Sequence, residues 1–301
     1  MRIAVAATPE VALPTLEALR VSSHELAFVI SRADAPAGRG RELRESPVAQ
    51  WAQRSGVEVK KPDTSDEIGA LVKGLDLVLT IGYGFILPEN ILQIPTHGFI
   101  NLHFSLLPRW RGAAPVQRAI EAGDSITGVT VFKLDKGMDT GPIYRTAQTP
   151  LSNGCNSAEL FEILAALGVK PVLDTLELIA AGEQPIVQNE AGSSRAKKLS
   201  KEEGHIDWSK EAIDIERKVN AFYGNPGAWS NFRGQILKID KVHVTEHVLP
   251  RGYMDVIDKK VLVGTSTCAL ELVEVTPAGK ATLAAAAWAN GARITSKDLL
   301  N

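Results

Sequence analysis

The first half of the chain alternates short apolar runs with helical patterns, and this alternation limits the fold more than any other sequence feature. Segments with strand signals occur at residues 3–7, 25–31, 57–60, 75–82, 98–104, 128–134 and 143–148. Helical spacing or helix-start residues occur at residues 9–21, 46–55, 64–73 and 114–122. Repeated strand–helix units predict an α/β fold built on a doubly wound, mostly parallel sheet.

A long helical stretch follows this alternation. Residues 156–181 begin with Asn156 and, three positions later, Glu159, which is the pattern of a capping box at a helix start. Gly168 and Pro171 interrupt the stretch, and both residue types are unfavourable in a helix interior. We therefore expect two helices with a break near these residues.

The composition changes after this helical stretch. Residues 189–203 are small, polar and basic, which is typical of a linker. A helix is predicted at 210–222, and strands at 236–244, 253–257, 260–263 and 269–275, separated by Gly, Pro and Asp turns. Short strands of this kind predict a small β-barrel, similar to an OB fold. The expected domains are residues 1–188 and 208–301, joined by a linker at 189–207.

Composition excludes several classes of protein. Lys and Arg total 33 against 35 Asp and Glu, and this net charge of −2 argues against a protein that coats nucleic acid. No apolar run approaches the roughly 18 residues of a membrane span, so no membrane partner is expected. Cys155 and Cys268 lie far apart without a CxxC pattern, which argues against a disulfide framework or a structural zinc site. We expect a reducing, cytoplasmic compartment.

Asn101 and His103 form the first candidate site. Because side chains alternate along a strand, these two polar groups share one face, opposite Leu102. They lie at the C-terminal end of a predicted parallel strand, where open α/β sheets bind their ligands. The chain then turns through residues 105–108, whose backbone groups suit a planar ligand. The alternative is a buried, hydrogen-bonded histidine beside a turn-stabilising amide.

The second candidate site directly follows the predicted strand 128–134. Here Asp135 and Asp139 alternate with Gly137 and Gly141. An acid at this place can orient an imidazole or accept a proton, and glycine lets the backbone approach a ligand. The alternative is an ordinary turn rich in Asp and Gly. The acids are too few for the register of a calcium loop.

The third candidate site is a loop that carries Arg39, Arg41 and Arg44 beside two glycines, Gly38 and Gly40. Arginines on such a loop suit contacts with the phosphates of RNA. The alternative is a charged loop that is simply solvated. Sequence alone leaves both interpretations open.

A nicotinamide-dependent oxidoreductase is a further possibility for an α/β chain. Leu43 stands where a GxGxxG fingerprint beginning at Gly38 requires its third glycine, and the first loop, residues 6–10, contains no glycine. Walker A, GxSxG and HExxH motifs are also missing from the sequence. These features argue against that class.

The candidate residues also form one combined pattern. It consists of Asn101, His103, Ser105, Leu106, Leu107, Pro108, Gly112, Asp135, Gly137, Asp139, Thr140 and Gly141. This pattern resembles the folate-dependent formyltransferases. The resemblance implies that Asn101, His103 and Asp139 are catalytic. It further implies that 10-formyltetrahydrofolate binds at Ser105, Leu106, Leu107 and Pro108, and the chemistry requires no metal.

Three further stretches resemble the branch of this family that acts on methionyl-initiator tRNA. They are residues 36–40 with 46–48, residues 109–120, and residues 198–203 before 206–208. The resemblance implies tRNA contacts from Arg39, Arg41, Arg44, Lys198 and Lys201, and a monomer. Ala7 departs from the family, which commonly has glycine there. From residue 206 onward, 12 Lys and Arg stand against 11 Asp and Glu, which gives little support for tRNA binding by the barrel.

The implied reaction moves a formyl group from N10 of the folate to the α-amino group of methionyl-initiator tRNA. Asn101 and His103 would donate hydrogen bonds to the formyl oxygen, and Asp139 would orient His103 or take the proton of the amine. One alternative is a related enzyme acting on a small molecule such as an amino-sugar nucleotide, which would need neither the arginine loop nor the barrel. Another is an RNA-binding protein with an inactive catalytic domain, which the intact trio argues against.

Overall fold

The computed structural model describes residues 1–37 and 42–301, and these form two compact units. The first unit comprises Met1–Gly112, Ile126–Thr149 and Phe161–Ala196. The second comprises Ala113–Ser125, Pro150–Leu160 and Lys197–Asn301. The units interleave along the chain, whereas the domains expected from the sequence are contiguous; the boundaries at 188 and 208 therefore stay a prediction.

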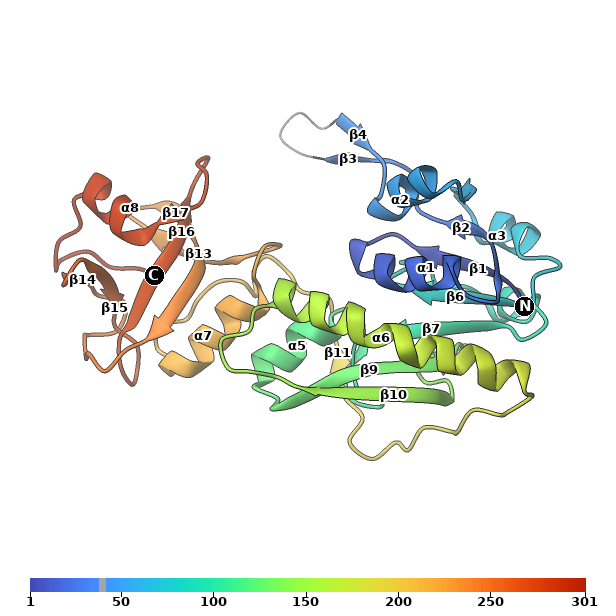
Figure 1. The fold of residues 1–301 in the computed structure, drawn as a ribbon. Helices are drawn as coiled ribbons and strands as arrows, with labels where there is room; N and C mark the ends of the chain where they lie inside the picture. Colours follow the sequence, from blue (N-terminus) through green and yellow to red (C-terminus); the bar gives the residue numbers. More distant parts are fainter. Residues whose placement is uncertain (38–41) are drawn as a thin grey trace. The chain divides into compact units, whose positions relative to one another are not determined.

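A seven-stranded sheet forms the centre of the first unit (Figure 1). Its order is β10 (Ile143–Pro150), β9 (Ile126–Lys133), β7 (Phe99–His103), β6 (Leu77–Ile81), β1 (Arg2–Ala7), β2 (Glu25–Ile30) and β5 (Val59–Lys60). The strands from β7 to β5 pair in parallel, and β9 pairs antiparallel with β7. The predicted α/β fold with a mostly parallel sheet is confirmed.

Helices connect these strands, and α2 and α3 begin at side-chain caps. They are η1 (Glu10–Ala12), α1 (Leu13–Arg20), α2 (Pro47–Ser55), α3 (Ser65–Leu71), α4 (Glu89–Leu92) and α6 (Ser157–Ala180). The Ser46 side chain accepts a hydrogen bond from the Ala49 amide at the start of α2, and Thr64 does the same for Glu67 at α3. Each cap satisfies an amide that the first helical turn leaves unpaired.

The expected break between two helices at Gly168 and Pro171 is wrong, because α6 runs unbroken from Ser157 to Ala180. Its start is the predicted capping box: the Asn156 amide donates to Glu159, and the Glu159 amide donates to the Asn156 side chain. Buried positions recur at helical spacing through the suspected break, at Leu160, Leu164, Gly168, Pro171, Val172, Thr175, Leu176 and Ile179. Packing of this continuous stripe outweighs the hydrogen bond that proline cannot make.

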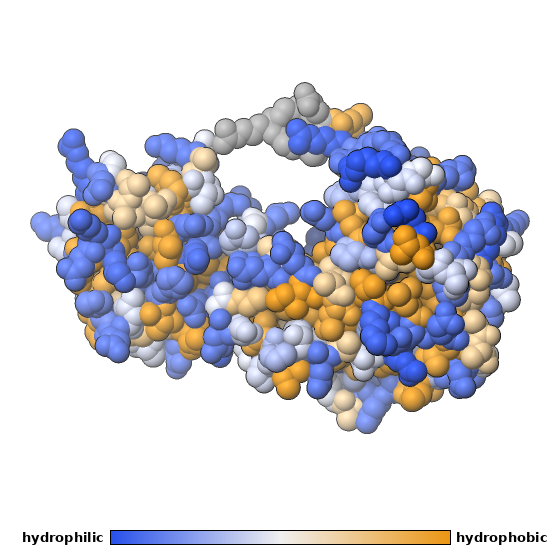
Figure 2. Space-filling view, viewed as in Figure 1, coloured by the Kyte–Doolittle hydropathy of each residue, from blue (hydrophilic) through white to orange (hydrophobic). Residues whose placement is uncertain are grey.

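Gly168 has a specific reason to lie inside this helix. A Cβ atom there would come within 2.7 Å of Cδ2 of Leu102 on β7. Helix α6 lies over the sheet (Figure 1), and the missing side chain at Gly168 lets helix and strand approach closely. On the outward side, Figure 2 shows hydrophobic residues gathered over α6, and Ile163 is 47% exposed.

The second unit contains a small antiparallel β-barrel. Its sheet order is β12 (Ala228–Phe232), β13 (Gln235–Val244), β16 (Leu270–Pro277), β15 (Lys260–Val263) and β14 (Met254–Ile257), with β17 (Leu283–Ala284) paired to β16. Helices α5 (Pro115–Ala122), α7 (Ala212–Ala221) and α8 (Ala285–Ala292) belong to the same unit. The sequence-based prediction did not include strands β12 and β17.

The last residues of the chain close this barrel. Leu300 bridges to Phe232 on β12, and Leu299 bridges to Tyr253 beside β14. The amides of Asn231 and Asn301 each donate to the carbonyl of the other residue, so the chain end is hydrogen-bonded to the first edge strand. One segment therefore pairs with β12 on one side and with Tyr253, next to β14, on the other. Across residues 1–37 and 42–301, no helix is long and apolar enough to cross a membrane.

Candidate active site

Two neighbouring parallel strands bring the first polar groups together. Thr80 on β6 is the register partner of Asn101 on β7, and His103 is the last residue of β7. The Thr80 hydroxyl lies 2.7 Å from Oδ1 of Asn101 and donates to it. Because Oδ1 of the amide accepts this bond, the NH2 group of Asn101 is turned away from Thr80 and is available as a donor.

His103 lies two residues further along β7 and is buried, with 6% of its surface exposed. Its Nε2 atom lies 3.0 Å from the Trp110 carbonyl, and a carbonyl only accepts, so Nε2 carries a proton. Its Nδ1 atom faces Oδ2 of Asp139 at 3.7 Å. In the neutral ring, Nδ1 is an acceptor, so two proton acceptors face each other across this gap.

Burial determines the protonation state of this histidine. Desolvation lowers the pKa of His103 below its usual range, although the Asp139 carboxylate and the Trp110 carbonyl act in the opposite direction. The imidazole is therefore neutral near pH 7. A neutral ring next to a carboxylate can accept a proton from a bound group.

The loop after β9 positions Asp139. The Gly112 amide donates to Oδ2 of Asp139 at 2.7 Å, which fixes the carboxylate beside His103. Asp135 organises the loop, because its Oδ1 accepts from the Gly137 amide at 3.0 Å and from the Thr140 hydroxyl at 2.8 Å. Among the described residues, Asp139 is the one of these two acids that lies against the imidazole of His103.

Gly112 is required by its surroundings. It belongs to β8 (Arg111–Gly112), which pairs in parallel with β11 (Arg195–Ala196). Its φ angle is 124°, and a Cβ atom would lie 2.7 Å from the Ala196 carbonyl oxygen. A side chain would therefore move the amide that holds Asp139.

Thr130 on β9 forms hydrogen bonds with the backbone of the turn that is predicted to bind the folate. The Thr130 hydroxyl donates to the Ser105 carbonyl at 2.7 Å and accepts from the Leu107 amide at 3.1 Å. The Ser105 hydroxyl donates to the Arg109 carbonyl. Ser105 and Leu107 are buried, whereas Leu106 and Pro108 are half-buried. Leu106 and Pro108 are therefore the more accessible side chains of this turn.

Comparison with known proteins identifies the family of this chain. A family model described as formyl transferase matches residues 1–176, and a model described as formyl transferase, C-terminal domain, matches residues 198–293. A protein of Thermobifida fusca named methionyl-tRNA formyltransferase is 43% identical, and the match covers 98% of this chain and 97% of that protein. The chain belongs to the methionyl-tRNA formyltransferase family. A relative of the same name from Streptomyces avermitilis is also 43% identical, with 100% of this chain and 99% of the relative covered.

Solved structures confirm the formyltransferase fold. HypX from Aquifex aeolicus, crystallised with tetrahydrofolic acid, has a TM-score of 0.70 at 20% identity, over 96% of this chain and 47% of HypX. The N-formyltransferase from Helicobacter canadensis, in complex with folinic acid and dTDP-3-aminofucose, has a TM-score of 0.69 at 17% identity, over 90% of this chain and 98% of that enzyme. The resemblance seen in the sequence is therefore confirmed at the level of family and fold.

The residues predicted to contact tRNA occur in both units of this formyltransferase. Arg44 ends β4 (Glu42–Arg44), which pairs with β3 (Ala35–Ala37), and its side chain is exposed. Arg39 and Arg41 lie outside the described residues. Lys198 and Lys201 are exposed in the second unit.

Two cations anchor the backbone that carries these lysines. Arg118 on α5 donates to the Lys197 carbonyl and forms an ion pair with Glu203 at 2.9 Å. Lys218 on α7 donates to the Glu203 carbonyl at 2.8 Å. The segment from 197 to 203 is therefore held by its backbone, while the side chains of Lys198 and Lys201 remain exposed.

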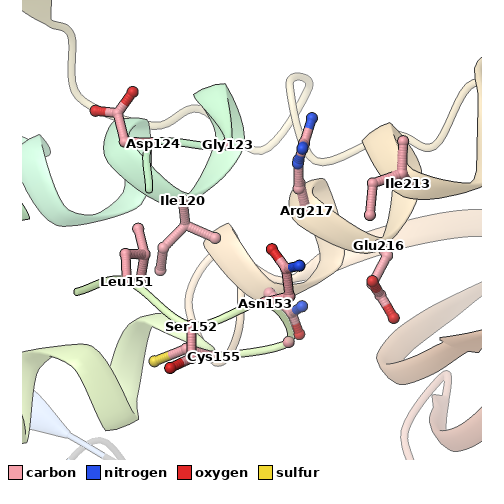
Figure 3. A pocket seen from close by; sticks show the side chains of 12 residues that line it. Ile120, Gly123, Asp124, Leu151, Ser152, Asn153, Cys155, Ile213, Glu216 and Arg217 are labelled. Atoms are coloured by element: carbon pink, nitrogen blue, oxygen red, sulfur yellow. The ribbon is translucent and has the colours of Figure 1, made fainter. Parts of the chain in front are cut away.

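The second unit contains a small pocket that lies apart from the predicted site residues. It lies between the end of α5, the loop 151–155 and α7 (Figure 3). Figure 3 shows Ile120 and Leu151 on one side and Arg217 and Glu216 of α7 on the other. Its volume of about 20 Å³ has room for roughly one water molecule, and none of the predicted site residues lines it. In the part of the chain that the structure describes, no group of three or more His, Cys, Asp or Glu side chains could hold a metal.

Several residues that shape the site were missed by the sequence analysis. They are Thr80, Thr130, Trp110, Gln188 and Ser194. Thr80 and Thr130 are polar residues inside strongly apolar strands, which is a recognisable pattern. The Trp110 carbonyl and the two distant residues Gln188 and Ser194 carry no local pattern, because their role depends on a long-range approach of the backbone.

Proposed function

We propose that this formyltransferase moves the formyl group of 10-formyltetrahydrofolate to the α-amino group of methionyl-initiator tRNA. The observation that carries the proposal is the Asn101, His103 and Asp139 cluster at the end of β7, in a chain similar over its full length to methionyl-tRNA formyltransferases. The tetrahydrofolic acid bound by the related HypX fold supports a folate donor.

Asn101 would stabilise the charge that develops on the formyl oxygen. When the amine attacks the formyl carbon, the carbonyl bond becomes a single bond and its oxygen becomes negative. The NH2 group of Asn101, oriented through its hydrogen bond from Thr80, is a preorganised donor for that oxygen. Removal of one such donor typically costs about 10²–10³ in kcat.

His103 and Asp139 would handle the proton of the amine. The hydrogen bond to the Trp110 carbonyl occupies the ring's N–H, so the neutral His103 offers Nδ1 as an acceptor rather than a donor to the formyl oxygen. An amine that approaches Nδ1 and Asp139 from the side can reach both acceptors, which lie 3.7 Å apart. It would lose one proton to this pair as the new N–C bond forms. N10 of the folate would take a proton as its bond to carbon breaks, leaving tetrahydrofolate and N-formylmethionyl-tRNA.

The remaining predicted residues would bind the two substrates. The turn of Ser105, Leu106, Leu107 and Pro108 would contact the folate. Arg44, Lys198 and Lys201, together with Arg39 and Arg41 outside the described residues, would contact tRNA phosphates. We further propose that the enzyme acts as a monomer in the cytoplasm. Amine attack on an activated formyl group needs no metal-generated hydroxide.

A formyl-transfer assay tests this function directly. Purified protein receives 10-formyltetrahydrofolate and either methionyl-initiator tRNA or methionyl-elongator tRNA, and formylmethionine is measured after hydrolysis of the product. We expect transfer to the initiator and little to the elongator. Transfer to a dTDP-amino sugar without transfer to either tRNA would support the small-molecule alternative instead.

A further inference from the structure

Gln188 is a buried polar side chain that lies next to the catalytic cluster but does not touch its side chains. Only 7% of its surface is exposed. Its Nε2 donates to the carbonyls of Asp139 at 2.9 Å and Gly141 at 2.7 Å. Its Oε1 accepts from Nη2 of Arg111 at 2.7 Å and from Nε at 3.2 Å. The two donors and two acceptors of the amide are therefore all used.

These four hydrogen bonds connect the two backbone segments that hold the catalytic pair. Arg111 follows Trp110, whose carbonyl orients His103, and precedes Gly112, whose amide orients Asp139. On the other side, the Gln188 donors hold the backbone of Asp139 itself. One side chain thus fixes the distance between the strand β8 and the Asp139 loop.

We infer that Gln188 is a positioning residue, which sets the separation of Asp139 and His103 for formyl transfer. The inference rests on the proposed function of that pair. The orientation of the Gln188 amide is determined by its partners, because backbone carbonyls only accept hydrogen bonds and the guanidinium only donates them. A carboxylate at this position would still accept from Arg111 but would lose both bonds to the Asp139 loop. A misplacement of about 1 Å costs about 10²-fold in rate.

The segment around Gln188 has further attachments, so a substitution there need not detach it. Ile186 and Ile143 form a backbone bridge, with both amides donating. The Ser194 hydroxyl accepts from the Trp110 amide at 2.9 Å, and β11 pairs with β8. The expected linker begins at residue 189, yet the residues up to Ala196 belong to the first compact unit. These contacts keep the chain in place when Gln188 alone is changed.

The decisive experiment is a double-mutant cycle of Gln188→Glu with Asp139→Asn, measured by single-turnover formyl transfer to methionyl-initiator tRNA. In the wild-type background we expect the single-turnover rate to fall about 10²-fold, while the KM values for folate and tRNA, measured separately in steady state, stay unchanged. In the Asp139→Asn background the same substitution should cost less than about threefold, because residues that act as a unit are not additive. Gln184→Glu, an exposed change of the same kind four residues earlier, should leave the rate unchanged.

The inference is overturned if Gln188→Glu costs the same factor in both backgrounds, or if the rate in the wild-type background does not fall. If Gln188→Glu fails to fold, Gln188→Asn replaces it, because the shorter amide keeps the polarity but cannot span both segments. In Gln188→Asn, the His103 titration followed by NMR gives a readout independent of activity. Since the Asp139 carboxylate raises the pKa of His103, a displaced Asp139 should lower it, and an unchanged titration counts against the inference. Wild-type protein without any formyl transfer would refute the proposed function instead, whatever the titration shows.

Discussion

At the scale of single residues, the site depends on hydrogen-bond direction more than on residue type. The shared strand face of Asn101 and His103 can be predicted from the sequence, because side chains alternate along a strand, whereas only the family resemblance singles out Asp139. Their orientation cannot be found there, since it is set by Thr80 and by the Trp110 carbonyl. The sequence analysis expected His103 to donate to the formyl oxygen, and we now propose Nδ1 as a proton acceptor.

Thr80→Val tests whether the orientation of the Asn101 amide matters. The substitution keeps the shape of the buried side chain but removes the hydroxyl that donates to Oδ1 of Asn101. We expect kcat to fall by about 3- to 10-fold, the value of one net hydrogen bond, with both KM values unchanged. Thr80→Ser retains the donor and should recover most of the rate in the same steady-state assay. Equal kcat values for the Val and Ser variants would disprove the role of the hydroxyl.

The neutral state of His103 has a consequence for stability against pH. Burial lowers the pKa of His103, so the unfolded ring, with an ordinary pKa of about 6.5, binds a proton at higher pH than the folded ring. The free energy of unfolding therefore decreases as pH falls below about 6.5, until the folded ring is also protonated. In His103→Gln this contribution is removed, and the loss between pH 7.5 and 5.5 should be smaller. Urea unfolding at pH 7.5 and 5.5 measures the free energy of unfolding of both proteins. The same loss of stability in wild type and His103→Gln would contradict the expectation.

At the scale of secondary-structure elements, the sequence predicts most strands and helices of the first unit, and its errors have different physical causes. The continuous burial of β6, from Leu77 to Ile81, explains why an apolar run identified it as a central strand. Helix α6 was expected to break, because the propensities of Gly168 and Pro171 were read without the packing that overrides them. Strand β12, Ala228–Phe232, alternates buried and half-buried residues over only five positions, too short a pattern to stand out.

Gly168→Ala tests the close packing of α6 on the sheet. Alanine improves helix propensity by about 1 kcal/mol, but its Cβ would lie 2.7 Å from Leu102, and overpacking of a buried site costs about 1–3 kcal/mol. We expect a net loss of about 1 kcal/mol, seen as a decrease of a few degrees in Tm. Combining Gly168→Ala with Leu102→Val removes the methyl group that the new Cβ would contact. The double variant should therefore lose less stability than the sum of the two single variants. Additive losses in the thermal scans would exclude this contact as the cause.

At the scale of the whole molecule, the net charge of −2 conceals how the charges are distributed. Glu121 and Glu203 are paired with Arg118 and Lys218, and these four side chains anchor the segment that carries Lys198 and Lys201. The net charge of −2 therefore includes acidic side chains whose role is to hold this segment through ion pairs within the second unit. The barrel itself remains close to neutral, so we expect RNA contacts to be few and local rather than spread over the surface.

A salt titration of tRNA binding tests this local mode of contact. The double variant Lys198→Ala/Lys201→Ala should raise KM for methionyl-initiator tRNA and leave kcat and the folate KM unchanged, because the lysines would contact phosphates and not the reacting atoms. Each lost phosphate contact should also reduce the slope of log KM against log salt by about 0.7–0.9. Lys170→Ala removes another exposed lysine, which lies on α6 and forms an ion pair with Asp174, and serves as the matched control. A slope that changes equally in the control and in the double variant would return Lys198 and Lys201 to the status of solvated surface charges.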